Sequence, residues 1–91
     1  MEIRFEWDEN KNVLNQINHG ISFETAKMVF SDPKRYEMFD FEHSLFEERW
    51  QTVGMAGWLL LAVIFTEKDD VIRIITAQKA SKSKQEEYFY G

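Results

Sequence analysis

The sequence predicts an α+β fold in which a strand and two helices precede an antiparallel sheet meander and a C-terminal helix. Three observations predict it. Apolar and charged residues alternate at the start, two capped helical segments follow before the only proline, and β-favouring residues then dominate as far as Thr76. Strands grouped after the helices, rather than alternating with them, are typical of the α+β class.

The first strand and the first helix have clear boundaries. Apolar and charged residues alternate from Glu2 to Trp7, as in a strand with one buried face, so core burial of Trp7 is favoured over stacking on a base. Asp8 stands at an N-cap position, and Gly20 ends the helix as a left-handed cap. Between them lies a narrow apolar stripe of the kind that packs on a core, formed by Val13, Leu14 and Ile17.

The second helix begins at Ser22, with Glu24 in its positively polarised first turn. Asp32 and Pro33 stop it, since proline disfavours helical backbone in the residue before it. The side of this helix predicted to face the core carries Phe23, Ala26, Val29 and Phe30.

The remainder of the chain predicts four strands and a helix. We expect strands near 36–39, 49–55, 58–66 and 71–79, with hairpin turns at 56–57 and 68–70 joining the last three into an antiparallel meander. Residues 59–65 are apolar without alternation, which indicates a central strand covered on both faces. Ser81 is placed to cap a final helix that runs to about Tyr90.

Length and composition narrow the class of protein. A chain of 91 residues, 44% hydrophobic, predicts one folded domain over residues 1–91. It has no cysteine, and His19 and His43 lack metal-ligand spacing, so we expect neither a disulfide, a metal site nor a cofactor. No segment is apolar for long enough to span a bilayer, and no signal peptide is evident, which predicts a cytoplasmic protein without a membrane partner.

The net charge of −5 opposes binding to a polyanion, because phosphate contacts supply much of the affinity for nucleic acids. Charge grouping can nevertheless create a local field of the opposite sign. Basic residues gather toward the C-terminus, at Arg73, Lys79, Lys82 and Lys84. The sequence therefore allows a basic patch on an acidic body.

Several motifs with specific spacing run along nearly the whole chain. The first comprises Phe5-Glu6-Trp7-Asp8, Lys11, Asn15 and His19-Gly20-Ile21-Ser22-Phe23-Glu24. It continues through Ala26, Val29-Phe30, Asp32-Pro33, His43-Ser44, Glu47-Glu48-Arg49, Gly54 and Arg73-Ile74-Ile75-Thr76-Ala77-Gln78-Lys79-Ala80. The pattern resembles the BrnT family of toxins from type II toxin–antitoxin systems. The resemblance implies a RelE-like fold, RNA cleavage without a metal, and silencing by a partner protein.

The resemblance also implies which residues act. An active surface built from the sheet and the C-terminal segment would use Arg49, Arg73 and Lys79 to hold a phosphate, and Glu47 or Lys11 for proton transfer. The substrate-binding residues would be Tyr88 and Lys82.

A plainer interpretation exists for each of these side chains. Arg73 could be salt-bridged within the sheet, and Lys79 and Lys11 could simply be solvated. Glu47 and Arg49, which alternation places on one face, could form a cross-strand ion pair with Arg73 or Lys68.

The predicted function is therefore that of a toxin: a metal-independent endoribonuclease that cleaves cellular RNA and inhibits growth until a cognate BrnA-like antitoxin binds it. The alternative is an interaction module of weak or no activity that binds the antitoxin and reaches DNA only through that complex, in repression of its own operon. Departures from the family pattern at Asn18, Gln78 and Lys84-Gln85 remove or move positive charge and favour this alternative, with exposed aromatics such as Trp58 and Phe89 offered to the antitoxin.

Overall fold

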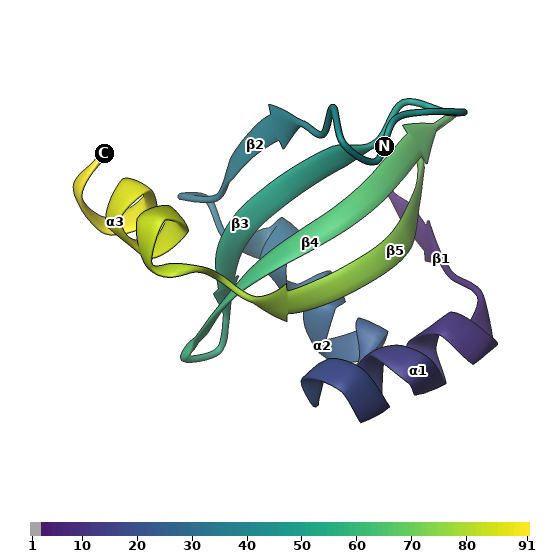
Figure 1. Ribbon diagram of the computed structural model, residues 1–91, viewed down its shortest axis with the longest axis horizontal. Helices are drawn as coiled ribbons and strands as arrows, with labels where there is room; N and C mark the ends of the chain where they lie inside the picture. The colour runs from purple at the N-terminus through teal and green to yellow at the C-terminus, as the bar shows by residue number, and fades with distance from the viewer. Residues whose placement is uncertain (1–2) are drawn as a thin grey trace.

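The structure, a computed structural model, describes residues 3–91, so Glu2 of the first predicted strand lies outside the described residues. Its elements follow the predicted α+β order (Figure 1). They are β1 (Arg4–Glu6), α1 (Glu9–His19), α2 (Phe23–Lys27), the 3-10 turn η1 (Met28–Ser31), β2 (Tyr36–Phe39), β3 (Trp50–Ala56), β4 (Leu59–Lys68), β5 (Val71–Lys79) and α3 (Lys82–Tyr90).

The strands form one sheet in the order β1-β5-β4-β3-β2. Strands β2 to β5 are antiparallel neighbours, which confirms the predicted meander, and β4 is central, with residues 61–65 all buried. The parallel pairing of β1 with β5 was not predicted, because a strand of three residues gives no signal about its neighbour. At the β4–β5 turn, Asp69 and Asp70 both adopt positive φ, as a two-residue hairpin turn requires.

The predicted caps are confirmed. Asp8 accepts hydrogen bonds from the amides of Asn10 and Lys11, and Gly20 ends α1 with a φ of 69°. Ser22 caps α2, and Ser81 caps α3. The second predicted helix is split, since α2 tightens into η1 before Asp32.

Helices α1 and α2 lie on one face of the sheet, here named the helix face (Figure 1). Its core includes Phe23, Ala26 and Val29, as predicted. The ring of Trp7 packs edge-on against Phe23 at 6.0 Å, which confirms core packing for Trp7. The strands contribute to this core the residues Ala56, Leu61, Val63, Phe65, Ile72, Ile74 and Ala77.

The prediction that the apolar stripe of α1 faces the core is wrong. Val13, Leu14 and Ile17 are 48%, 55% and 72% exposed, whereas the buried residues of α1 are Asn12 and Asn15. The asparagines are inside because they hydrogen-bond to backbone that has no other partner: the Asn12 side-chain oxygen accepts from the amide of Phe23 at 2.8 Å. A buried polar side chain is tolerated when it is satisfied in this way. Helix α1 therefore turns its apolar stripe to solvent.

Two polar side chains close the parts of the sheet edges that no strand covers. Strand β1 pairs only with residues 71–73 of β5, and further along Asn15 donates to the carbonyl of Ala77 at 2.8 Å and accepts from its amide at 3.1 Å. Strand β2 pairs only with residues 50–53 of β3, and beyond it Asp32 accepts from the amide of Met55 at 2.8 Å. These contacts stabilise both edges without an additional strand.

A bulge in β5 changes which way its residues face. Phe65 pairs with Ile74 but Ile64 pairs with Thr76, so β5 contains one additional residue, Ile75. Residues paired across strands share a face. Arg73, opposite Thr66, therefore lies on the face away from the helices, whereas Lys79, opposite the core residue Leu61, leaves the strand on the helix face.

Candidate functional site

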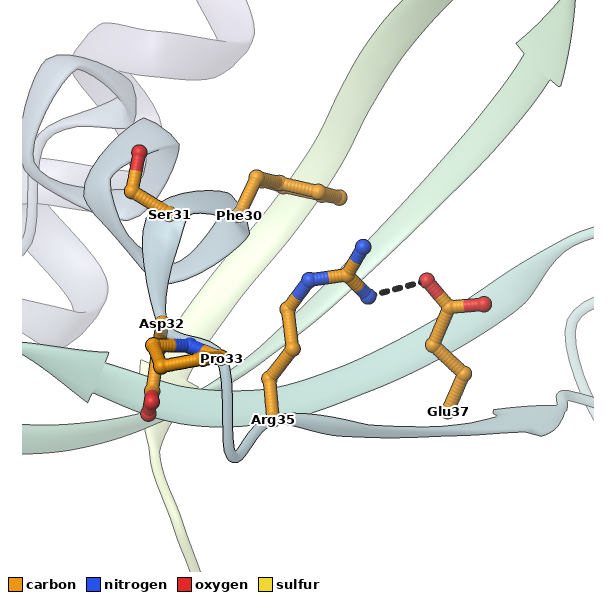
Figure 2. A pocket seen from close by; sticks show the side chains of 6 residues that line it. All are labelled: Phe30, Ser31, Asp32, Pro33, Arg35 and Glu37. Atoms are coloured by element: carbon orange, nitrogen blue, oxygen red, sulfur yellow. Dashed lines mark hydrogen bonds and ion pairs between the residues drawn. The ribbon is translucent and has the colours of Figure 1, made fainter.

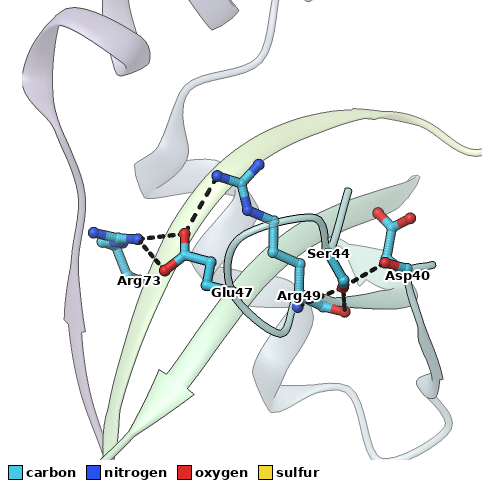
Figure 3. A network of polar contacts seen from close by, with 5 residues as sticks. All are labelled: Asp40, Ser44, Glu47, Arg49 and Arg73. Atoms are coloured by element: carbon cyan, nitrogen blue, oxygen red, sulfur yellow. Dashed lines mark hydrogen bonds and ion pairs between the residues drawn. The ribbon is translucent and has the colours of Figure 1, made fainter. Parts of the chain in front are cut away.

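Three of the predicted site residues meet at one end of the sheet and form what we call the arginine cluster: Glu47, Arg49 and Arg73 (Figure 3). Nη2 of Arg73 donates to both carboxylate oxygens of Glu47, at 2.8 and 3.0 Å. Nη2 of Arg49 donates to Oε1 of the same carboxylate at 3.3 Å. The two guanidinium groups thus converge on one oxygen, and the ion pair expected as the plainer interpretation of Glu47 is present.

The strands and one loop position this cluster. Arg73 pairs with Thr66 of β4, and Arg49 directly precedes Trp50, which pairs with Phe65, so the two arginines flank β4. Their backbones are about 10 Å apart, twice the spacing between strands. Glu47 reaches them from the loop between β2 and β3, which Ser44 closes by accepting from the amide of Arg49 at 2.9 Å (Figure 3).

A hollow of about 580 Å³ lies beside the cluster. It is lined by Arg4, Glu6, Glu47, Glu48, Thr66, Glu67, Lys68, Asp69, Val71 and Arg73. Five of these side chains are acidic and three are basic, so the hollow has no surplus of positive charge. Arg4 and Lys68 were not among the predicted site residues. Lys68 could have been found from the turn at Asp69-Asp70. A two-residue hairpin turn there pairs Lys68 with Val71, which lies two residues before Arg73 on the neighbouring strand.

Both arginines retain donors that nothing satisfies. Within residues 3–91, Nε of Arg49 and Nε of Arg73 are buried and have no hydrogen-bond partner, and the same holds for the side-chain oxygen of Gln51. Buried donors without partners are uncommon in folded proteins and often mark a functional position. Glu47 therefore satisfies each guanidinium only in part.

The other predicted site residues lie elsewhere. Lys79 is six residues along β5 from Arg73, about 20 Å in an extended strand, and borders a groove beside α3. Lys11 lines a separate hollow of about 270 Å³ between α1 and β5. Lys82 and Tyr88 belong to α3. The structure thus brings together Glu47, Arg49 and Arg73 and leaves the rest apart.

Tyr88 fastens α3 to the body of the protein. Its hydroxyl donates to Oδ2 of Asp32 at 2.5 Å, and the same oxygen accepts from the amide of Met55. Burial opposes ionisation of Asp32, but hydrogen bonds from Tyr88, Met55 and Lys34 together hold its pKa below 3.8. Burial and this hydrogen bond to Asp32 raise the pKa of Tyr88 to about 12.

A further hollow, of about 500 Å³, lies where η1 turns into β2, and its lining consists of Phe30, Ser31, Asp32, Pro33, Arg35 and Glu37 (Figure 2). Arg35 is ion-paired with Glu37 and lies over the ring of Phe30. The turn packs tightly on β3, since a Cβ at Gly54 would lie 2.8 Å from that of Arg35. Among the described residues, Arg35 is the only arginine that lines this hollow, so no second guanidinium converges on it there.

In the described part of the chain, His, Asp and Glu side chains form no group of three or more that could hold a metal ion. No helix within residues 3–91 combines the length and apolarity needed to cross a bilayer.

Two guanidinium groups that converge beside an open hollow on an α+β sheet are typical of proteins that bind phosphate or carboxylate groups. Comparison with protein families identifies the class more narrowly. Residues 7–84 match the family described as the ribonuclease toxin, BrnT, of type II toxin-antitoxin systems, and the chain belongs to this family. A search of curated proteins found no match.

Proposed function

We propose that the chain is a RelE-like toxin that cuts cellular RNA at the arginine cluster without a metal ion. Its action would be cytoplasmic and would inhibit growth until a BrnA-like antitoxin binds. The family match supports the ribonuclease class. The observation that carries the assignment to this site is the convergence of Arg49 and Arg73 on one carboxylate oxygen, at 3.3 and 2.8 Å.

In this proposal a phosphodiester enters between the two guanidiniums and displaces the Glu47 carboxylate from them, so that Glu47 is left beside the phosphate and free to accept a proton. A phosphate group suits the fork geometry of arginine as well as a carboxylate does. The buried Nε groups of Arg49 and Arg73 give the pair further donors for the oxygens of a more highly charged transition state.

The proposed reaction is attack by the 2′-hydroxyl on the adjacent phosphorus. The 2′-oxygen–phosphorus bond forms while Glu47 accepts the hydroxyl proton, and the bond from phosphorus to the 5′-oxygen breaks. In this proposal Lys68, which lines the same hollow, returns a proton to the leaving oxygen. The products are a 2′,3′-cyclic phosphate and a 5′-hydroxyl end, and Arg49 and Arg73 stabilise the charge on the intermediate phosphorane.

The test is incubation of the purified chain with total RNA in EDTA, followed by mapping of the new ends. We expect cyclic phosphate and 5′-hydroxyl ends at discrete positions. Induced expression in a host without the antitoxin should stop growth and produce the same ends. Cleavage that disappears in EDTA would contradict metal independence, and 3′-hydroxyl products would contradict attack by the 2′-oxygen.

A second candidate function is favoured by a different observation, the apolar stripe that α1 exposes. In this alternative the chain is a weak or inactive module that binds the antitoxin through Val13, Leu14 and Ile17 and contributes to operon repression. Ile17→Glu should then abolish antitoxin binding while the fold persists, because Ile17 is 72% exposed. Gln16→Glu, on the neighbouring exposed position, is the matched control. Harmless expression of a chain that still binds its antitoxin would favour this candidate.

A further inference from the structure

A groove of about 240 Å³ runs between the tip of the β3–β4 hairpin and helix α3. Its lining consists of Met55, Trp58, Leu59, Leu60, Lys79, Ala80, Gln85 and Phe89, and we name it the Trp58 groove. Trp58 is 91% exposed and Phe89 is 57% exposed. Phe41, Phe46 and Tyr90 are highly exposed as well, but the Trp58 groove brings two exposed aromatic side chains together in one hollow.

The conformation of the hairpin tip keeps Trp58 in solvent. Gly57 adopts a φ of 64°, and a Cβ placed there would have no neighbour within 4 Å, so the tip projects away from the body of the protein. Trp58 follows directly and leads into β4. Phe89 is held opposite because Tyr88, the preceding residue, is bonded to Asp32. The wall formed by α3 is thus positioned by a contact outside the groove.

The three lysines near this groove differ from the four ion-paired cations of the molecule, although among the described residues Arg4, Lys11, Lys34 and Lys68 are unpaired as well. Lys27, Arg35, Arg49 and Arg73 each have a glutamate partner. Among the described residues, Lys79, Lys82 and Lys84 have no carboxylate within 4.0 Å, and residues 78–85 include no acid; Glu86 and Glu87 follow one turn later. Lys82 lies on the same side of α3 as Gln85 and Phe89, by the i, i+3, i+7 spacing.

We propose that the Trp58 groove binds an unpaired base of the RNA substrate, which stacks on Trp58 and Phe89, while Lys79 and Lys82 contact the flanking phosphates. Proteins hold single-stranded nucleic acid by this combination of aromatic faces and unpaired cations. The inference rests on the proposed function and deepens it, since it assigns a place on the chain where substrate affinity arises.

The charges of the two sites support a division of roles, with binding at the Trp58 groove and reaction at the arginine cluster. The hollow at the arginine cluster has more acids than bases, so it attracts a polyanion poorly. The Trp58 groove lies about 20 Å away, outside the reach of the reacting phosphate, and therefore supplies binding rather than chemistry. Thr76 and Gln78, which share the face of Arg73 beyond the bulge, are uncharged, whereas Lys79 leaves β5 on the opposite face.

The test uses an RNA that cannot be cut: a fluorescent 2′-O-methyl oligonucleotide of about eight nucleotides, within the range of single-strand sites. Binding is measured by anisotropy as a function of salt. Trp58→Ala should weaken binding about ten-fold or more and leave the salt slope unchanged, and Trp58→Phe should restore most of the affinity. Lys79→Ala should also weaken binding but reduce the salt slope by about 0.7.

Tyr90→Ala is the matched control, because Tyr90 is an 87% exposed aromatic of α3 that does not line the groove. Unchanged affinity in Trp58→Ala would overturn the proposal. If that variant instead lost only the antitoxin, the groove would be a protein contact, and the proposal would again fail. A chain that binds through Trp58 but cuts no RNA would refute the proposed function alone, whereas cutting with an unchanged KM in Trp58→Ala would refute only the groove.

Discussion

The two ends of β5 carry the same sign of charge but differ in how that charge is used. At one end Arg73 is 43% exposed and is bound to both oxygens of Glu47. At the other, Lys79 borders an aromatic groove, with no acidic partner among the described residues. Net charge thus describes neither end: in this acidic protein Arg73 is held by an acidic partner, whereas Lys79 has none among the described residues.

The bulge at Ile75 produces this division. In a regular strand Arg73 and Lys79 would share a face, since six residues separate them. The additional residue reverses the alternation, so the two cations leave the strand on opposite faces. Asn15 holds the strand immediately after the bulge by binding both backbone groups of Ala77. A helix side chain therefore determines where the lysine end lies.

The largest expected effect comes from Arg73→Gln, which removes one guanidinium from the arginine cluster. We expect kcat to fall by about 100-fold or more, since a donor aimed at developing charge contributes on this scale. Affinity for the uncut oligonucleotide should hardly change. Arg35→Gln is the matched control, because Arg35 also pairs with a glutamate but lines another hollow. Equal losses in both variants would show that ion pairing, and not position, matters.

The second prediction tests the bulge. Asn15→Ala should lower the free energy of unfolding by about 2–4 kcal/mol, because it leaves the carbonyls of Ile21 and Ala77 and the amide of Ala77 without their partner. Chemical denaturation measures this loss. Asn18→Ala, an exposed residue of the same helix, should change stability by only a few tenths of a kcal/mol. Similar stability of the two variants would mean that the sheet edge does not need Asn15.

The helix caps and the orientation of α1 indicate what the sequence could and could not predict about the fold. Caps, turns and the meander were predictable because each depends on local chemistry: Asp8 and Ser81 as N-caps, Gly20 at a left-handed C-cap. The orientation of α1 was not predictable, because hydropathy ranks Asn12 and Asn15 as surface residues. Only the position of unpaired backbone on β5 and α2, which is a tertiary property, explains their burial.

The candidate site was predictable to a similar extent. Alternation predicted that Glu47 and Arg49 lie on one face, and the two are ion-paired, although Glu47 lies in the loop before β3 and not in a strand. The ion pair of Glu47 with Arg73 was among those considered. The separation of Lys79 could not be predicted, since a single bulged residue leaves no pattern in a strand rich in isoleucine. The exposure of Trp58 was equally hidden, because an aromatic residue beside a turn is buried or exposed according to what packs over the turn.

A third change, Glu47→Gln, tests the contrast between the ion-paired arginines of the cluster and the unpaired Lys79. It removes the negative charge from between Arg49 and Arg73, so the arginine end should come to resemble the lysine end. Affinity for the oligonucleotide should rise several-fold and depend more strongly on salt, since two more cations can reach phosphates. The cleavage rate should fall, because the amide accepts no proton. Faster cleavage would show that Glu47 only blocks the site.

The smallest expected effect concerns the hydrogen bond that holds the wall of the Trp58 groove. Tyr88→Phe should reduce the free energy of unfolding by about 1 kcal/mol at neutral pH, the value of one hydrogen bond. In the native chain the contribution of this hydrogen bond to stability depends on pH both in the acidic and in the alkaline range. The pKa of Asp32 lies below 3.8, so its part is present above that pH and is lost as the pH falls through the lowered value.

At high pH the dependence runs in the opposite direction, and stability is lost as the pH rises, because the pKa of Tyr88 is raised from 10.0 to about 12. Its contribution is complete below pH 10 and disappears as the pH rises through about 12. Denaturation midpoints at a series of pH values, compared between the native chain and Tyr88→Phe, measure both limbs. The difference between the two proteins should shrink toward each extreme. A difference that stays constant over the whole series would mean that the contribution of the Tyr88 hydroxyl does not depend on the ionisation of Asp32 or of Tyr88, and a difference near zero would mean that Tyr88 holds α3 by packing alone.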